Sequence, residues 1–222
     1  MADTLIVGNS DGIGLEVTRR LLEKGRTVFG ISRSASPLAD PRYTHLRLDV
    51  TDPEYRHQLR DVLVQSGTPE LCLYCAGVGY KFDLQKMERE SQTLAVNLMG
   101  FVYTVEEVLP GMKEAGKGHF IGLSSVSDVL RGTVAPAYGA SKAGMTFYMA
   151  GLQRFVRPYG IRVTNVRFGY VDTKLAKARS KPLMLSVDEA ARDVLQCIER
   201  KPRVLSRPRV VAAAAKVMGL LQ

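Results

Sequence analysis

The hydrophobic pattern of the chain is a series of short apolar runs separated by longer stretches of mixed polarity. Most of these runs are continuous rather than alternating, which is typical of strands buried on both faces of a parallel sheet. The pattern predicts seven strands, at Asp3–Val7, Thr27–Ile31, His45–Val50, Leu71–Ala76, Phe120–Leu123, Ile161–Phe168 and Arg203–Ser206.

Between the runs, apolar residues recur at helical spacing. The spacing predicts helices from Leu15 to about Gly25, from about Leu84 to Met112, from Pro136 to about Arg157, from Ser186 to Arg200 and from Val210 to Leu221. Ser186 and Glu189 form a capping box at the start of the fourth of these helices. Strands that alternate with helices predict an α/β fold in one domain. It would be a Rossmann-like, doubly wound parallel sheet of about seven strands with helices on both faces.

Composition and charge limit the class of protein and its possible binding partners. The chain is 45% hydrophobic and 24% charged, which is ordinary for a soluble globular protein. No apolar run reaches the roughly 18 residues that span a bilayer, and the N-terminus lacks the pattern of a signal peptide, so we expect a cytoplasmic location. The net charge is +9, and residues 151–222, with 15 Lys+Arg against 5 Asp+Glu, carry all of the excess. Without interleaved aromatic residues or a recognition motif, this excess does not indicate nucleic-acid binding.

The three cysteines do not indicate a disulfide framework or a metal site. Their number is odd, and no export signal precedes them. Cys72 and Cys75 are three apart in a predicted strand, so their side chains should face opposite sides of the sheet. We therefore expect no metal or redox site at this pair.

A glycine-rich loop connects the first predicted strand to the first helix. Strand, glycine turn and helix is the context in which backbone N–H groups hold a diphosphate at a helix N-terminus. The loop predicts a dinucleotide site made by Gly8, Asn9, Ser10, Asp11, Gly12, Ile13 and Gly14.

The residues after the second and third strands bear on which dinucleotide is bound. Arg33, beside Ser32, stands where an acidic residue would bind the 2′-hydroxyl of NAD, and a positive group there suits the 2′-phosphate of NADP. The sequence therefore favours NADP(H) over NAD(H), although Asp11 inside the loop argues the other way. A solvated loop arginine is the alternative. Asp49 is placed to accept a hydrogen bond from the adenine amino group.

Tyr138 and Lys142 are four residues apart and should share one face of a helix. A lysine ammonium beside a phenol lowers the phenol pKa, which makes a general acid/base at neutral pH. The alternative is a surface tyrosine and lysine on an ordinary helix. The rest of the chain favours the catalytic interpretation.

Taken together, these motifs resemble the short-chain dehydrogenase/reductase family over about the first 175 residues. The family's glycine motif is similar to Val7-Gly8-x-x-x-Gly12-Ile13-Gly14, and its Asn-Asn-Ala-Gly to Tyr74-Cys75-Ala76-Gly77. The Asp-Val pair, the mid-helix Asn and the Ser-Tyr-Lys spacing match Asp49-Val50, Asn97, and Ser125, Tyr138 and Lys142. The Pro-Gly motif after the sixth strand appears as Phe168-Gly169, followed by Val171-x-Thr173.

The resemblance implies a role for each of these residues. Ser125 and Tyr138 would hydrogen-bond the substrate carbonyl oxygen, and Tyr138 would transfer the proton. Lys142 would lower the Tyr138 pKa and hold the nicotinamide ribose, while Asn97, through a helix irregularity, would hold a water that links Lys142 to solvent. The other residues implied to contact the cofactor are Val50, Cys75, Ala76, Gly77, Gly169, Val171 and Thr173.

The expected activity is hydride transfer between NADP(H) and a small carbonyl or alcohol substrate, which the sequence does not identify. A catalytically silent NADP(H) sensor is the alternative. The family resemblance implies a homo-oligomer, a dimer or possibly a tetramer. We expect the domain to cover residues 1–206, with a substrate lid at about 173–186. Residues 207–222 should form a basic, apolar helix that packs on the domain or a partner subunit, or contacts a membrane surface.

Overall fold

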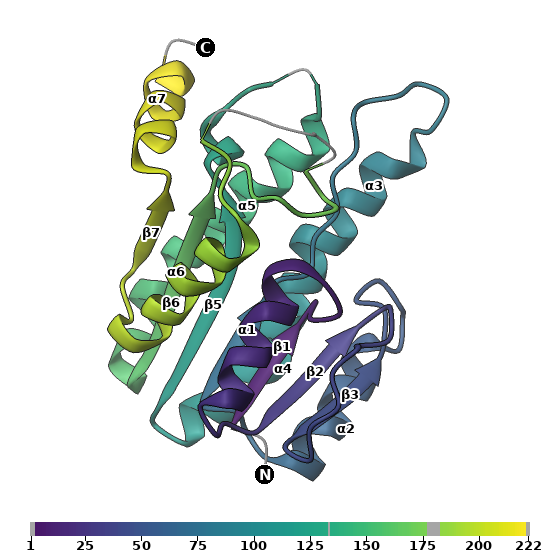
Figure 1. The fold of residues 1–222 in the computed structure, drawn as a ribbon, viewed down its shortest axis with the longest axis vertical. Coiled ribbons are helices and arrows are strands. Elements are labelled where there is room, and N and C mark those ends of the chain that lie inside the picture. The colour runs from purple at the N-terminus through teal and green to yellow at the C-terminus, as the bar shows by residue number, and fades with distance from the viewer. Residues whose placement is uncertain (1–2, 133, 177–182, 221–222) are drawn as a thin grey trace.

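The computed structural model describes residues 3–132, 134–176 and 183–220. Seven strands form one parallel sheet in the order β3-β2-β1-β4-β5-β6-β7, which confirms the predicted Rossmann-like α/β fold (Figure 1). The strands are β1 (Thr4–Val7), β2 (Val28–Ser32), β3 (Tyr43–Arg47), β4 (Leu71–Tyr74), β5 (Gly118–Ser125), β6 (Ile161–Phe168) and β7 (Val204–Arg207).

Helices cover both faces of this sheet. Helices α1 and α6 pack on one face, and α2, α4 and α5 pack on the other. The helices are α1 (Gly12–Glu23), α2 (Tyr55–Ser66), α3 (Glu88–Leu94), the π-helix η1 (Ala95–Met99), α4 (Gly100–Glu114), the 3₁₀ turn η2 (Val126–Val129), α5 (Pro136–Phe155), the 3₁₀ turn η3 (Arg157–Tyr159), α6 (Val187–Arg200) and α7 (Arg209–Leu220).

Each face of the sheet has its own hydrophobic core. In β1, Leu5 and Val7 point into the core under α4 and α5, whereas Ile6 points into the core under α1 and α6. This arrangement explains the continuous apolar runs, because both faces of every central strand are buried. Cys72 packs in the first core and Cys75 against the second, which confirms that the two thiols face opposite sides.

Two predicted elements have different boundaries in the structure. The third strand is Tyr43–Arg47 rather than His45–Val50, because Asp49 accepts hydrogen bonds from the backbone N–H (2.9 Å) and hydroxyl (2.8 Å) of Thr51 and so turns the chain out of the ladder. The predicted helix from Leu84 to Met112 begins at Glu88, and the π-helix η1 interrupts it.

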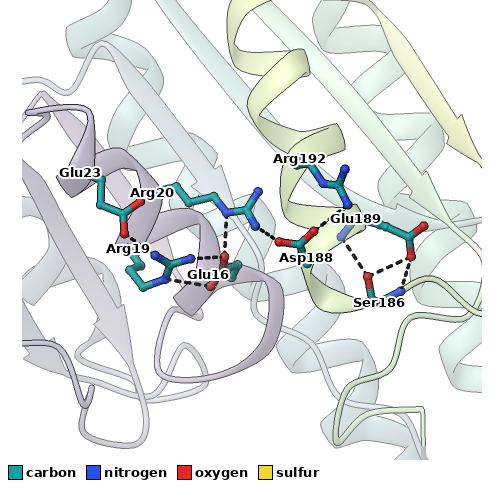
Figure 2. Close-up of polar contacts among 8 residues, drawn as sticks. All are labelled: Glu16, Arg19, Arg20, Glu23, Ser186, Asp188, Glu189 and Arg192. Carbon is teal, nitrogen blue, oxygen red and sulfur yellow. Dashed lines mark hydrogen bonds and ion pairs between the residues drawn. The ribbon is translucent and has the colours of Figure 1, made fainter.

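Ion pairs join α1 to α6 on the outside of the sheet (Figure 2). Arg20 of α1 donates to Glu16 at 2.7 Å and also to Asp188, which in turn accepts from Arg192 at 2.7 Å. Ser186 and Glu189 form the predicted capping box at the start of α6. Exposed pairs of this kind contribute little each, about 0–1 kcal/mol, so their main effect is to set the position of the α6 N-terminus beside α1.

The C-terminal helix α7 follows β7 and packs against η2 (Figure 1). The sequence predicts one apolar face, made by Val210, Val211, Ala214, Val217, Met218 and Leu221. The structure divides it, because Val211, Ala214 and Met218 border a cavity, although Met218 is 52% exposed, whereas Val210 and Val217 do not line it. The predicted face was too wide for all of its residues to pack against one surface. Its last member, Leu221, lies outside the described residues. Among the described helices, none is long and apolar enough to cross a membrane.

Candidate active site

One large pocket opens at the carboxyl ends of the strands and has a volume of about 1780 Å³. It lies where the strand order reverses, because the chain leaves β1 for β2 on one side and enters β4 on the other. Open α/β sheets bind their ligands at such a switch point. The pocket is lined by the ends of β1, β2, β4, β5 and β6, by the start of α5, and by η2 and α7.

The glycine loop forms a backbone cradle on one side of this pocket. A Cβ atom on Gly8, whose φ is +88°, would lie 2.4 Å from the backbone nitrogen of Ala76, and a Cβ on Gly14 would lie 2.2 Å from the Gly8 carbonyl oxygen. Only glycine permits these contacts. The loop therefore presents backbone rather than side chains at the N-terminus of α1, as a bound diphosphate requires.

Two side chains of the loop are not directed as the sequence suggested. Asn9 is fully buried and donates to the Tyr43 hydroxyl at 2.7 Å, so its side chain holds the loop to β3 instead of facing the pocket. Asp11 caps α1 by accepting from the Gly12 N–H at 2.7 Å and pairs with Lys174 at 2.6 Å. The hydrogen bond from Lys174 is the main cause that lowers the pKa of Asp11. The negative charge that argued against phosphate binding thus has a cation beside it.

The residues predicted to contact the adenosine end line the same pocket. Arg33 is exposed at the rim, next to the end of β2. Ser32 is buried and donates its hydroxyl to the Ser34 carbonyl at 2.8 Å, so it supports the Arg33 turn rather than presenting its hydroxyl to a ligand. Asp49 and Val50 form the opposite wall.

Ser125, Tyr138 and Lys142 meet at the centre of the pocket, as predicted. Ser125 ends β5, and Tyr138 and Lys142 lie on the first turns of α5. The Lys142 ammonium donates to the Leu123 carbonyl oxygen at 2.8 Å and lies 5.8 Å from the centre of the Tyr138 ring. Ser125 also hydrogen-bonds the Tyr138 hydroxyl.

The neighbour Ser127 orients the hydroxyl of Ser125. The Ser125 oxygen accepts from the Ser127 N–H at 3.1 Å and from the Ser127 hydroxyl at 2.8 Å. Because a hydroxyl has two acceptor lone pairs and one proton, these two bonds leave the Ser125 proton free to be donated toward Tyr138. The sequence did not point to Ser127, whose spacing to Ser125 is the only signal for it.

Burial controls the pKa values at this centre. It raises the pKa of Tyr138, an effect that the hydrogen bond from Ser125 opposes. It lowers the pKa of Lys142 to about 8, because the ammonium is 4% exposed. We expected Lys142 to lower the pKa of Tyr138, but burial raises that pKa, and the hydrogen bond from Ser125, not Lys142, opposes it. The reason is geometric, since the ammonium is directed at the Leu123 carbonyl.

Asn97 lies in the π-helix η1, so the helix irregularity implied by the family resemblance is present. Its side chain exchanges two hydrogen bonds with the backbone of Val78, at 2.8 and 2.9 Å, and donates to Ser141 at 3.0 Å. Asn97 therefore ties the loop after β4 to α5 and lies behind the pocket wall. Tyr74 accounts for the irregularity, because its hydroxyl donates to the Val96 carbonyl at 2.6 Å.

The segment after β6 closes the remaining side of the pocket. Gly169, Val171 and Thr173 line it, and a Cβ on Gly12 would lie 3.3 Å from Thr173 Cγ2. The base of the predicted lid is closed by backbone hydrogen bonds between Leu185 and Tyr170 and between Asp172 and Leu185, both at 2.9 Å. Residues 177–182, which carry most of its basic residues, lie outside the described residues.

A buried ion pair behind the site was not predicted. The Asp128 side chain is fully buried and accepts from Arg167 Nε at 2.7 Å and from the Thr146 hydroxyl at 2.6 Å. Thr146 also lies 2.8 Å from the Ser124 hydroxyl. These bonds tie η2, which follows Ser125, to β6 and α5. Among the described residues, no group of three His, Cys, Asp or Glu side chains could hold a metal ion.

Replacing Asp128 by Ala should destabilise the fold strongly, because it leaves the Arg167 guanidinium, only 17% exposed, without its carboxylate. We expect the free energy of unfolding to fall by about 3 kcal/mol or more, and the double variant Asp128→Ala/Arg167→Met to recover most of that loss. Asp188→Ala, which removes the exposed α1–α6 pair, should cost far less, because solvent screens that pair. Urea denaturation measures all three, and equal losses at positions 128 and 188 would contradict the argument.

Replacing Lys142 by Met should change how stability depends on pH. The pKa of Lys142 falls from 10.5 to about 8 on folding. Its contribution to stability is therefore fully present above about pH 10.5 and is lost as the pH falls through about 8. The wild type should gain about 2 kcal/mol in unfolding free energy relative to Lys142→Met between pH 7 and pH 9.5. Urea denaturation at both pH values tests this, and a difference that does not change with pH would refute it.

Comparisons with known proteins identify the family. A family model described as short chain dehydrogenase matches residues 3–183. The chain is 29% identical to the 3-ketodihydrosphingosine reductase of Bacteroides thetaiotaomicron, over 95% of this chain and 80% of that protein. It is 28% identical to an uncharacterized oxidoreductase of Myxococcus xanthus, over 98% of this chain and 91% of that protein.

Solved structures share the fold. A short-chain dehydrogenase from Streptomyces avermitilis aligns with a TM-score of 0.85 at 24% identity, over 99% of this chain and 93% of that one. One from Burkholderia cenocepacia in complex with NADP aligns with 0.86 at 22% identity, over 97% and 92%. One from Leptospira borgpetersenii with bound NAD+ aligns with 0.76 at 22% identity, over 86% and 83%. With the glycine cradle and the match over residues 3–183, these findings show that the chain belongs to the short-chain dehydrogenase/reductase family of oxidoreductases.

Proposed function

We propose that this protein is an NADP(H)-dependent oxidoreductase that transfers a hydride between nicotinamide C4 and a carbonyl or alcohol substrate, with Tyr138 as the general acid/base. The observation that carries the proposal is that Ser125, Tyr138 and Lys142 line the same pocket as the glycine cradle. The name of the Bacteroides relative, a ketone reductase, supports a carbonyl substrate.

The residues present fit a nicotinamide dinucleotide. The backbone cradle at Gly8 and Gly14 leaves room for a diphosphate where side chains would clash. In this proposal Arg33 would bind the 2′-phosphate, Asp49 and Val50 would contact the adenine, and Lys142 would bind the nicotinamide ribose. The residues beyond β4 and β6 that would hold the nicotinamide end are Cys75, Ala76, Gly77, Gly169, Val171 and Thr173. When bound, the dinucleotide supplies or accepts the hydride.

The protein's own side chains then bind and protonate the carbonyl oxygen. Ser125 donates a hydrogen bond to that oxygen and so positions the substrate, because Ser127 already satisfies the lone pairs of its hydroxyl. Tyr138 donates the proton that the oxygen gains on reduction. A phenol, with an ordinary pKa of about 10, is protonated at neutral pH and so has this proton to give. Lys142, with a pKa of about 8, is mostly protonated at pH 7 and lies close enough to stabilise charge that develops on Tyr138.

The choice of NADP(H) rests on this chain's own residues. Solved structures with the same fold contain NADP in one case and NAD+ in another. Arg33, at the pocket rim after β2, is the feature that favours the extra phosphate of NADP(H). A homo-oligomer and a cytoplasmic location stay predictions. Nothing in the described site favours the alternative of a silent NADP(H) sensor.

The variant Tyr138→Phe tests the general acid. We expect it to reduce turnover about 10³-fold, since it removes the proton donor, while the dissociation constant for NADPH changes less than about twofold. NADPH oxidation over quinones, 3-oxoacyl thioesters, ketosteroids, sugars and aldehydes measures turnover, and fluorescence titration measures binding. Tyr148→Phe, on the same helix but outside the pocket, is the control. Turnover by Tyr138→Phe within tenfold of the wild type would rule out the mechanism.

The variant Arg33→Gln tests the cofactor assignment. Loss of the guanidinium should weaken NADPH binding tenfold or more, because a charge-assisted bond to phosphate is lost, and should leave NADH binding within about twofold. Arg42→Gln is the control, because Arg42 pairs with Asp40 outside the pocket. Fluorescence titration with NADPH and with NADH measures the two dissociation constants for each variant. The assignment fails if wild-type protein binds NADH more tightly than NADPH, or if Arg33→Gln weakens both cofactors equally.

A further inference from the structure

Helix α7 forms a wall of the pocket, at the end away from the glycine loop. Its residues Val211, Ala214, Ala215 and Met218 all line the pocket. Their spacing of i, i+3, i+4 and i+7 places them on one helical face, so together they make a continuous apolar stripe. This helix lies beyond residues 3–183, the part of the chain that the family model matches.

Close backbone contact holds α7 in this place. A Cβ atom on Gly219 would lie 2.2 Å from the carbonyl oxygen of Val129 in η2, so only glycine allows the helix to approach so closely. At the other end of α7, a Cβ on Gly169 would lie 3.5 Å from Val211 Cγ1. The helix thus bridges the two loops that follow Ser125 and β6, and its stripe lines the pocket that Tyr138 also lines.

The rest of this space is also apolar. Val129 and Leu130, beside the point where α7 meets η2, line it together with Ala135, and Leu175 lines it from the lid segment. The whole pocket, at about 1780 Å³, exceeds the roughly 300–1,000 Å³ typical of a site for one small ligand. A dinucleotide and a substrate can therefore be held together. The charged residue that α7 adds at the pocket, Lys216, is exposed, so its ammonium can remain in water.

We propose that the substrate is a ketone, or the matching secondary alcohol, with an unbranched alkyl chain, and that the α7 stripe binds this chain. The proposal rests on the proposed function. Residues 211 to 218 span about 10 Å along the helix axis, which matches an extended chain of roughly eight carbons. With the carbonyl at Tyr138 and Ser125, the chain lies along the α7 stripe, beside Val129 and Leu130. Burial of apolar surface supplies the affinity.

A homologous series of substrates tests the chain site. We would measure kcat/KM of the full-length protein with NADPH for 2-alkanones from 2-butanone to 2-tridecanone. Each methylene that becomes buried should raise kcat/KM roughly threefold, until the stripe is filled and the values level off.

Two matched variants locate the effect on α7. Ala214→Phe fills the stripe, whereas Ala213→Phe makes the same change at an exposed neighbour that does not line the pocket. Ala214→Phe should lower kcat/KM for 2-undecanone about tenfold or more and change that for 2-butanone less than about twofold. Ala213→Phe should leave both values near wild type. If Ala214→Phe fails to fold by circular dichroism, Gly219→Ala replaces it, since its Cβ would displace α7 from η2 and should remove the same preference.

A binding measurement separates the two proposals. The shift in melting temperature with 2-undecanone, compared with 2-butanone, reports the chain site without turnover. If ketones of all lengths are reduced equally well, or if the variants at 213 and 214 behave alike, the chain site is refuted and the proposed function stands. If no ketone is reduced but 2-undecanone stabilises the wild type and not Ala214→Phe, the site stands and the proposed function fails. If neither turnover nor stabilisation occurs, both are refuted.

Discussion

The constraint on which this structure depends is that all seven strands run parallel. A parallel neighbour can be reached only by a crossover that returns over a face of the sheet, so every segment that leaves a strand leaves it at the same edge. The glycine loop after β1, Arg33 after β2, Ala76 after β4 and Ser125 at the end of β5 are distant in sequence and share one pocket for this reason. The functional site follows from the topology before any side chain is considered.

Burial at that edge then determines the chemistry of the site. The same packing that excludes water raises the pKa of Tyr138 and lowers the pKa of Lys142 to about 8. A buried ammonium is costly, and it persists here because the Leu123 carbonyl accepts a hydrogen bond from it. Behind it, Asp128 and Arg167 bury a second pair of charges and hold the turn after Ser125 to the sheet. Burying Lys142 and the Asp128–Arg167 pair thus costs stability, and these same buried groups hold the geometry of the site.

The C-terminal part of the chain forms one wall of the pocket. The family model matches residues 3–183, and full-length relatives align over 98–99% of the chain, which includes β7 and α7. Strand β7 extends the sheet beside β6, and this places α7 over the open end of the pocket. An element at this position alters the shape of the substrate space and leaves the cofactor cradle untouched. This division explains how one fold can serve many substrates.

The sequence by itself determined the order of strands and helices, the glycine loop, the Ser125, Tyr138 and Lys142 set and the Ser186 capping box, because each depends on local spacing. The tertiary structure decided what depends on contacts between distant residues. Asp128 and Arg167 are 39 residues apart, and no local pattern pairs them. Local spacing also did not reveal that Asn9 turns inward to Tyr43, that β3 ends at Arg47, or which face of α7 lines the pocket. The pKa of Tyr138 belongs to this group as well, since burial is a property of the whole fold.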